Sequence, residues 1–201
     1  AWEQLGAHLR ETQLIGSSQS TLYWDQNTAM PSEAAPWRGE QLTLLAKQLH
    51  RRQSSPAYAD LVAAARQGWN EGERCPAMGR NLDLLEQDLR RQQALDTNLV
   101  AALAQAKADG YARWQQARAT SDFALFAPAL QTLIDLRQEQ ARQLQEPRGC
   151  WETPAQPFEP DLTLKSLQEL FAPLRKRLPE LLGRIKGGPR PGSLSWDLPV
   201  A

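Results

Sequence analysis

β-Branched aliphatic residues are scarce in this chain, and their scarcity limits the folds that it can adopt. In 201 residues Val occurs three times and Ile three times, and no run alternates such residues with polar ones. Strands are enriched in these residue types because branched side chains pack well on a pleated surface. The sequence therefore predicts an all-α fold. The six positions are Val62, Val100, Val200, Ile15, Ile134 and Ile185.

Apolar residues recur instead at steps of three and four, and the clearest series lies between residues 164 and 185. These steps place all its members on one face of a helix. Thr163 precedes the series and is a suitable N-cap. Pro173 and Pro179 lie inside it, and we expect a kink or a break there because each proline removes a backbone donor. The apolar stripe consists of Leu164, Leu167, Leu170, Phe171, Leu174, Leu178, Leu181, Leu182 and Ile185.

Capping residues mark further helix starts upstream. Asp96 and Asp122 are suitable N-caps for two helices, and we expect Pro128 to bend the second one. Ser55 followed by Pro56 is the signal of an N-cap with proline at the first helical position. Regularly spaced leucines indicate additional helices over residues 42–49 and 82–89.

Together these patterns predict a multi-helix bundle of about seven helices. We expect a single domain over residues 1–186, which is long enough to bury a core without disulfides or a metal. Gly and Pro indicate loops over residues 68–76 and 146–160. Residues 187–201 show no periodicity and are predicted to form an irregular tail or linker.

Composition argues against several classes of partner. Lys plus Arg equals Asp plus Glu at 23 each, whereas nucleic acids and anionic membranes attract proteins with a positive face. No apolar run approaches the roughly 20 residues that span a bilayer. The first residues lack the basic and then apolar layout of a signal peptide. Two distant cysteines, Cys75 and Cys150, favour free thiols in a reducing compartment, so we expect a cytoplasmic protein.

The chain offers no recognisable catalytic or metal-binding motif. Its two histidines, His8 and His50, belong to no H-E-x-x-H pair, which would place two imidazoles on one helix face around zinc. Arg51 and Arg52 follow His50 and disfavour a metal cation, so each histidine is interpreted as a surface residue late in a helix. There is no G-x-S-x-G and no phosphate-binding loop. We therefore predict no catalytic residue, no metal ligand and no cofactor within this chain.

Carboxylates are frequent but carry no specific signal. Asp83, Glu86 and Asp88 lie close together and are followed by Arg90 and Arg91. This pattern is most simply a solvated helix face with pairing between residues four apart.

The segment from Tyr23 to Pro31 combines aromatic, acidic, amide and hydroxyl groups. One interpretation is a helix end, with Trp24 and Met30 covering the core while Asp25 or Thr28 bonds free backbone donors. The alternative is a binding role, since exposed aromatic and amide groups could grip a peptide backbone. The residue types alone favour the helix end and leave the second reading open.

The same segment carries a resemblance to a known family. Three stretches, in order and with similar spacing over residues 20–185, resemble the carboxypeptidase Taq family. The first is Trp24-Asp25-Gln26-x-Thr28-x-Met30-Pro31, followed by Arg38, Gln41, Leu45 and His50. The second is Gly110-Tyr111-x-x-Trp114-x-x-Ala117-Arg118 with Asp122-Phe123-Ala124-Leu125-Phe126-Ala127-Pro128, and the third is Phe158-Glu159-Pro160-Asp161-Leu162-Thr163 with Leu167, Leu170, Phe171 and Leu174.

The resemblance implies a fold and a chemistry. Members are all-helical zinc carboxypeptidases that remove C-terminal residues from peptides, and their N-terminal helices form one wall and a lid of a deep cleft. Their zinc ligands and general base lie in the later part of chains more than twice as long as this one. The resemblance therefore makes five residues candidates for lining the substrate cleft: Trp24, Asp25, Gln26, Thr28 and Met30.

We accordingly expect the N-terminal part of a metallocarboxypeptidase, inactive alone, whose missing C-terminal half holds zinc or another divalent metal and completes the peptide site. Apolar surface normally covered by that half would then be exposed and would favour self-association, for instance as a homodimer. The alternative is a non-enzymatic helical module that binds a peptide or a protein.

Overall fold

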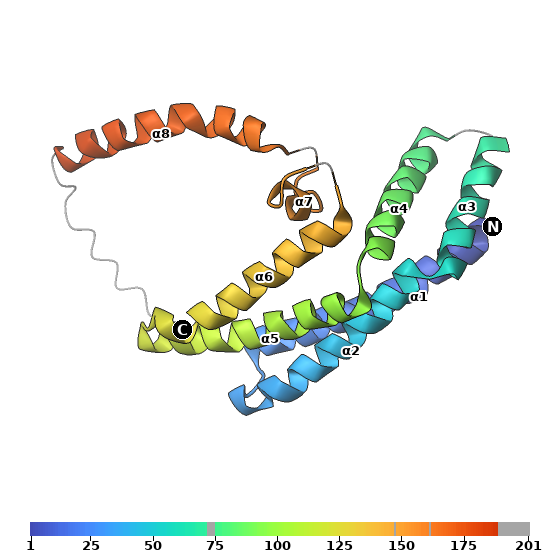
Figure 1. The fold of residues 1–201 in the computed structure, drawn as a ribbon, viewed down its shortest axis with the longest axis horizontal. Helices are drawn as coiled ribbons and strands as arrows, with labels where there is room; N and C mark the ends of the chain where they lie inside the picture. The colour runs from blue at the N-terminus through green and yellow to red at the C-terminus, as the bar shows by residue number, and fades with distance from the viewer. Residues whose placement is uncertain (72–74, 147, 161, 189–201) are drawn as a thin grey trace. The chain divides into compact units, whose positions relative to one another are not determined.

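The computed structural model describes residues 1–71, 75–146, 148–160 and 162–188, which form helices and no strand (Figure 1). The prediction of an all-α chain is confirmed, with eight α-helices in the described residues where about seven were expected. The helices are α1 (Trp2–Thr28), α2 (Ala35–Ser54), α3 (Pro56–Glu71), α4 (Pro76–Ala94), α5 (Thr97–Thr120), α6 (Ala127–Leu144), α7 (Glu152–Ala155) and α8 (Leu164–Lys186), with 3-10 turns η1 (Ser32–Ala34) and η2 (Phe123–Leu125).

Three predicted helix starts are confirmed in atomic detail. The Ser55 hydroxyl accepts a hydrogen bond from the Tyr58 N–H at 3.1 Å, and α3 begins at Pro56. The Asp96 carboxylate accepts from the N–H groups of Asn98 and Leu99 at the start of α5. At α8 the Thr163 hydroxyl accepts from the N–H of Ser166, whose hydroxyl in turn accepts from the N–H of Thr163. Local capping chemistry thus fixes these boundaries.

One prediction about proline is wrong, and a second is right only in part, because α8 is curved but not broken at its prolines. Asp122 caps the 3-10 turn η2 and not α6, so Pro128 falls in the first turn of α6. Proline is tolerated there because the first-turn N–H groups have no partner within the helix, and no bend is needed. Pro173 and Pro179 do not break α8, which is continuous over Leu164–Lys186. Figure 1 shows α8 as a single, arched helix.

The loop predictions are partly wrong as well. Helix α3 continues through Gly68 to Glu71, and residues 72–74 of the expected loop lie outside the described residues. The stretch 146–160 contains the short helix α7. Of the predicted tail, residues 189–201 lie outside the described part of the chain. The domain limits expected at residues 1 and 186 stay a prediction.

The chain divides into two units, Ala1–Pro154 and Ala155–Ala201, and the packing within each is that of its described residues. In the first unit, one core joins α1, α3 and α4 through buried apolar residues. Helix α5 carries a second set of mostly small buried side chains, which permit close approach of neighbouring helices. A Cβ added at Gly110 of α5 would lie 3.1 Å from Cδ1 of Leu133 on α6. The first core consists of Leu5, Tyr58, Val62, Ala65, Leu82 and Leu89, and the buried α5 set of Leu99, Ala101, Leu103, Ala104, Ala108 and Ala117.

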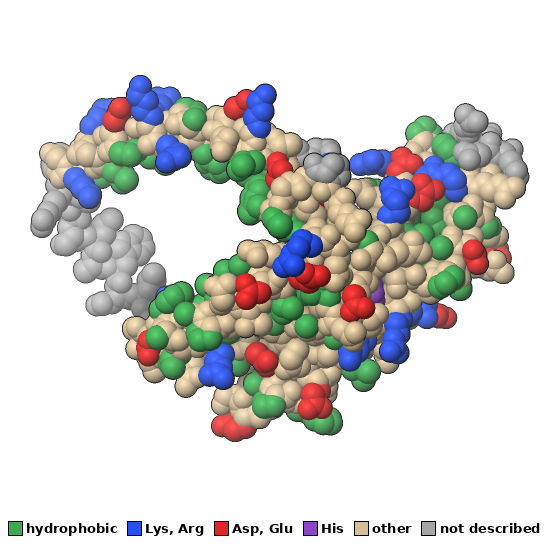
Figure 2. Space-filling model, in the orientation of Figure 1, with side chains coloured by type: hydrophobic (Ala, Val, Ile, Leu, Met, Phe, Trp, Pro, Cys, Tyr) green, Lys and Arg blue, Asp and Glu red, His purple; other side chains and the backbone are tan. Residues whose placement is uncertain are grey.

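In the second unit, α8 has no buried residue. Its stripe side chains other than Leu167 are 43–63% exposed, so the predicted amphipathic face exists but is uncovered. Figure 2 shows apolar side chains mainly along one side of α8 and most of its Lys and Arg side chains along the other. No helix of the described residues is long and apolar enough to cross a membrane.

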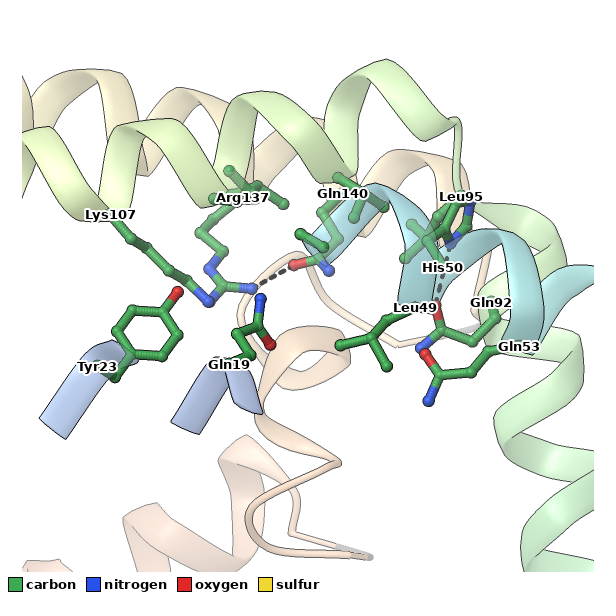
Figure 3. Close-up of a pocket in the computed structure, with 14 residues that line it drawn as sticks. Gln19, Tyr23, Leu49, His50, Gln53, Gln92, Leu95, Lys107, Arg137 and Gln140 are labelled. Atoms are coloured by element: carbon green, nitrogen blue, oxygen red, sulfur yellow. Dashed lines mark hydrogen bonds between the residues drawn. The ribbon is translucent and has the colours of Figure 1, made fainter. Parts of the chain in front are cut away.

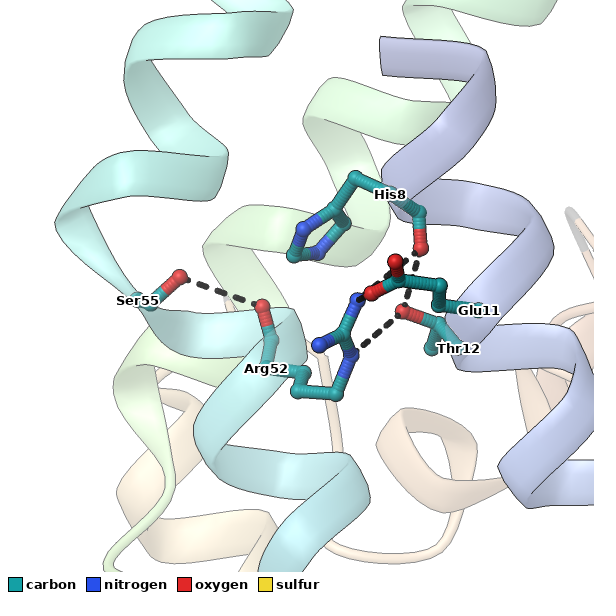
Figure 4. A network of polar contacts seen from close by, with 5 residues as sticks. All are labelled: His8, Glu11, Thr12, Arg52 and Ser55. Carbon is teal, nitrogen blue, oxygen red and sulfur yellow. Dashed lines mark hydrogen bonds and ion pairs between the residues drawn. The ribbon is translucent and has the colours of Figure 1, made fainter. Parts of the chain in front are cut away.

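A polar network ties α1 to the end of α2 (Figure 4). The Arg52 guanidinium donates to the hydroxyl of Thr12 at 3.1 Å, to the carbonyl of His8 at 3.3 Å and to the carboxylate of Glu11 at 2.9 Å. The His8 ring stacks on Tyr58, with centroids 4.8 Å apart, and its buried Nε2 has no hydrogen-bond partner among the described residues. Burial, and secondly the positive charge of Arg52, lower the pKa of His8 below its ordinary value.

This lowered pKa predicts a pH-dependent stability. The unfolded chain binds a proton at His8 below pH 6.5, its ordinary pKa, while the folded chain resists protonation, so stability falls as pH drops below 6.5. Replacing His8 with Phe keeps a ring against Tyr58 and removes the titration. In urea unfolding at a series of pH values, His8→Phe should therefore lose less stability than the unmodified chain between pH 7 and about 5. Identical pH profiles would contradict this assignment.

Candidate functional site

The segment Tyr23–Pro31 is a helix end, as the residue types favoured, because α1 ends at Thr28. The side-chain roles expected of such an end are wrong. Trp24 does not cover the core but is 65% exposed. The Thr28 hydroxyl donates to the carbonyl of Trp24 at 2.8 Å and so bonds no free N–H. Asp25 accepts from an arginine side chain of the next helix rather than from backbone.

That arginine is Arg38, which is buried to 9% exposure near the start of α2. Its guanidinium donates to the carbonyl of Leu22 and to the carboxylate of Asp25, both on α1. Its Nε donates to Oε1 of Gln41 at 3.0 Å. A buried guanidinium needs acceptors around its donors, and these three supply them. The contact therefore fixes the last turns of α1 against α2.

The turn after Asp25 borders a pocket of about 640 Å³ between the end of α1, the start of α2 and the second half of α5. Gln26 lines it and is 7% exposed, and its Oε1 is buried with no hydrogen-bond partner among the described residues. Unpaired buried acceptors are rare because each costs about 1–3 kcal/mol. The lining residues are Gln26, Met30, Ser32, Ala35, Tyr111, Ala112, Arg113, Gln115, Gln116 and Ala119.

Of the five predicted cleft residues, the pocket brings together two, Gln26 and Met30. Trp24 and Thr28 are exposed outside its lining, and Asp25 is bound to Arg38. The sequence prediction missed Ser32 and the contribution of α5. The second stretch that resembles the family did contain a signal for α5, namely Tyr111. The centroid of the Tyr111 ring lies 5.8 Å from that of Trp114.

The pocket can accept a hydrogen-bond donor next to an apolar surface. Gln26 offers the buried amide acceptor, while Met30 and Tyr111 offer apolar and aromatic surface. A peptide group has an N–H donor beside apolar side chains and suits this combination.

A second pocket, of about 300 Å³, lies among α1, α2, α4, α5 and α6 (Figure 3). His50 lines it and is 3% exposed, with its Nδ1 3.2 Å from Oε1 of Gln92. The prediction of a surface histidine is therefore wrong for His50, although it does lie late in α2. The residues that line this second pocket are Gln19, Tyr23, Ala46, Leu49, His50, Gln53, Gln92, Leu95, Val100, Leu103, Ala104, Lys107, Arg137 and Gln140.

Carboxylates of α4 form ion pairs between helices, which corrects the expected pairing along one helix. Arg66 of α3 donates to Asp83 at 2.6 Å and to Glu86 at 2.7 Å. Asp88 is exposed, but neighbouring protein atoms partly desolvate its carboxyl and raise the pKa of that group above the ordinary value. Within the described ranges, no three His, Cys, Asp or Glu side chains come close enough to hold a metal ion.

Comparison with known proteins assigns the class. The chain matches the Carboxypeptidase Taq (M32) metallopeptidase family over residues 4–194, and it belongs to this family. The resemblance seen in the three sequence stretches is thereby confirmed.

Individual relatives show how much of the family's length is present. Thermostable carboxypeptidase 1 of Thermus thermophilus is 28% identical over 201 residues, which are 95% of this chain and 39% of that protein. Thermostable carboxypeptidase 1 of Pyrococcus furiosus is 26% identical over 185 residues, 91% of this chain and 36% of that one. The crystal structure of the M32 carboxypeptidase from Deinococcus radiodurans R1 superimposes with a TM-score of 0.73 at 28% identity, covering 94% of this chain and 38% of that chain. The chain thus spans less than two fifths of each.

The unpaired acceptor predicts an unusual substitution effect. Gln26→Leu keeps a side chain of similar volume and removes the buried Oε1, so it should stabilise the chain by about 1 kcal/mol. Gln48→Leu on the exposed face of α2 is the matched control, expected to change stability by less than about 0.5 kcal/mol. Urea unfolding of both variants measures the difference. A clear destabilisation by Gln26→Leu would mean that Oε1 is already satisfied.

Proposed function

We propose that this chain is the N-terminal, substrate-cleft-forming part of a metallocarboxypeptidase that removes C-terminal residues from peptides. The main support is membership of the M32 family over residues 4–194 together with coverage of only 36–39% of the curated relatives' length. The pocket beside Gln26 adds a second argument, since its buried acceptor and apolar surface suit a peptide group.

The metal and the catalytic groups belong, in this proposal, to the remainder of a longer enzyme. This division is supported by the surroundings of the two histidines, since His50 is bonded to Gln92 and His8 lies beside the positive charge of Arg52. In the complete enzyme zinc or another divalent cation would activate a water molecule for attack on the peptide carbonyl. The chain by itself would bind without cleaving.

Gln26 has the central role in the proposed peptide site. Its buried Oε1 would accept a backbone N–H of the peptide, and Met30 and Tyr111 would contact neighbouring side chains. Asp25 acts indirectly, because its bond to Arg38 holds the turn that carries Gln26. Trp24 and Thr28 remain exposed candidates at the edge of the cleft.

The apolar face of α8 would be covered by the remainder of the enzyme. Eight apolar side chains of α8, each 43–63% exposed, form a continuous stripe that is open to solvent. Such a stripe is typical of a surface buried by another part of the protein. In the isolated chain it would favour self-association, with a homodimer as the simplest form. The free, exposed Cys75 and Cys150 agree with a cytoplasmic site of action.

Peptide binding to the isolated chain tests the proposal. The probe is an N-acetylated tripeptide of alanine and phenylalanine with a free C-terminal carboxylate, titrated by calorimetry. Gln26→Leu should weaken its affinity about three- to tenfold, which corresponds to the loss of one hydrogen bond. Because the same substitution is expected to stabilise the fold, weaker binding could not be attributed to unfolding.

Gln48→Leu serves again as the control and should bind the tripeptide like the unmodified chain. Equal affinities for all three proteins, or no binding to any of them, would remove Gln26 from the proposed site. Cleavage of the tripeptide by this chain alone would contradict the proposed division between cleft wall and catalytic half.

A further inference from the structure

Two cations meet in the pocket of Figure 3 without a compensating acid. Lys107 extends from α5 and Arg137 from α6 toward the same space beside Tyr23 and Gln19 of α1. None of the fourteen residues that line the pocket is Asp or Glu. Within the described part of the chain, neither Lys107 nor Arg137 forms an ion pair. The pocket therefore holds two positive charges that no neighbouring carboxylate balances.

This arrangement is costly in the folded chain. Like charges repel, and partial burial removes water that would otherwise screen them. The Lys107 residue is exposed to solvent. Even so, partial desolvation of its ammonium group, and secondly the positive charge of Arg137, lower the pKa of Lys107 below the ordinary value. By comparison, Arg38, Arg52, Arg66 and Arg91 of the same unit each have a carboxylate partner. Lys107 and Arg137 differ from these four arginines because no carboxylate pairs with them, although they share one pocket, and an anion bound between them would balance their charges.

Neutral polar groups complete the wall around the two cations. Arg137 donates one hydrogen bond to Oε1 of Gln140 at 2.6 Å, which orients the guanidinium and leaves its other donors available. The Tyr23 hydroxyl and the Gln19 amide face the same space (Figure 3). Burial raises the pKa of Tyr23, so its hydroxyl stays protonated and can donate. Ammonium, guanidinium and phenol donors around one space are the groups that bind oxyanions.

We infer that this pocket binds a small oxyanion, a phosphate or a carboxylate, between Lys107 and Arg137. The volume of about 300 Å³ lies at the small end of ligand pockets and admits a compact ligand. On the far side His50 is already bonded to Gln92, so the anion contacts concentrate at the Lys107 end. The site shares no lining residue with the Gln26 pocket and does not depend on the proposed peptide function.

Calorimetric titration with inorganic phosphate, and separately with acetate, tests the inference at constant ionic strength. Lys107→Met and Arg137→Met should each weaken binding about tenfold or more, since each removes one charge-assisted contact. Arg10→Met, an exposed arginine of α1, is the matched control and should leave affinity unchanged. Tighter binding of phosphate assigns a phosphate ligand, and tighter binding of acetate assigns a carboxylate.

Thermal unfolding in anion-poor buffer gives an independent readout. Lys107→Met relieves the repulsion with Arg137, so its melting temperature should equal or exceed that of the unmodified chain, while the rise caused by the bound anion should be lost. Absence of binding by both anions would overturn the inference. So would equal losses of affinity in Arg10→Met and Lys107→Met, because the effect would then be general charge screening.

Discussion

The contact of Arg38 with the end of α1 is the interaction on which the candidate peptide site depends. A buried guanidinium is stable only when its donors are paired, and Arg38 pairs with Leu22, Asp25 and Gln41. Two of these partners lie in the last turns of α1. The contact therefore fixes the position of the next residue, Gln26, whose acceptor is unpaired. The favourable contacts of Arg38 thus hold the unpaired Oε1 of Gln26 in place one residue after Asp25. Binding sites commonly contain such unsatisfied groups.

Features that depend on neighbouring residues in sequence could be predicted. The caps at Ser55, Asp96 and Thr163 act within one helical turn, and each marks a real helix start. The apolar stripe of α8 follows directly from its spacing. Proline was harder, because its effect depends on the exact position in a helix. A boundary shifted by a few residues turns the expected bend at Pro128 into a normal first-turn proline.

Contacts between distant residues could not be predicted in the same way. Nothing in the sequence pairs Asp25 with Arg38, or Arg66 with Asp83, because these partners meet only after the helices pack. His50 next to two arginines indicated an exposed residue, yet α4 supplies Gln92 to bond its buried ring. The family resemblance directed attention to residues 24–30 and so found Gln26 and Met30. The residues of α5 that complete the pocket required the three-dimensional arrangement.

The central claim, that the pocket beside Gln26 is one wall of a peptide cleft, can be tested by photo-cross-linking. The N-acetylated tripeptide, carrying a benzophenone on its phenylalanine, is irradiated with the chain, and the labelled residues are mapped by mass spectrometry. The account predicts labels on residues 26–35 and 111–119, reduced by excess unlabelled tripeptide. Labels confined to the apolar face of α8, or labels that excess tripeptide does not reduce, would contradict it.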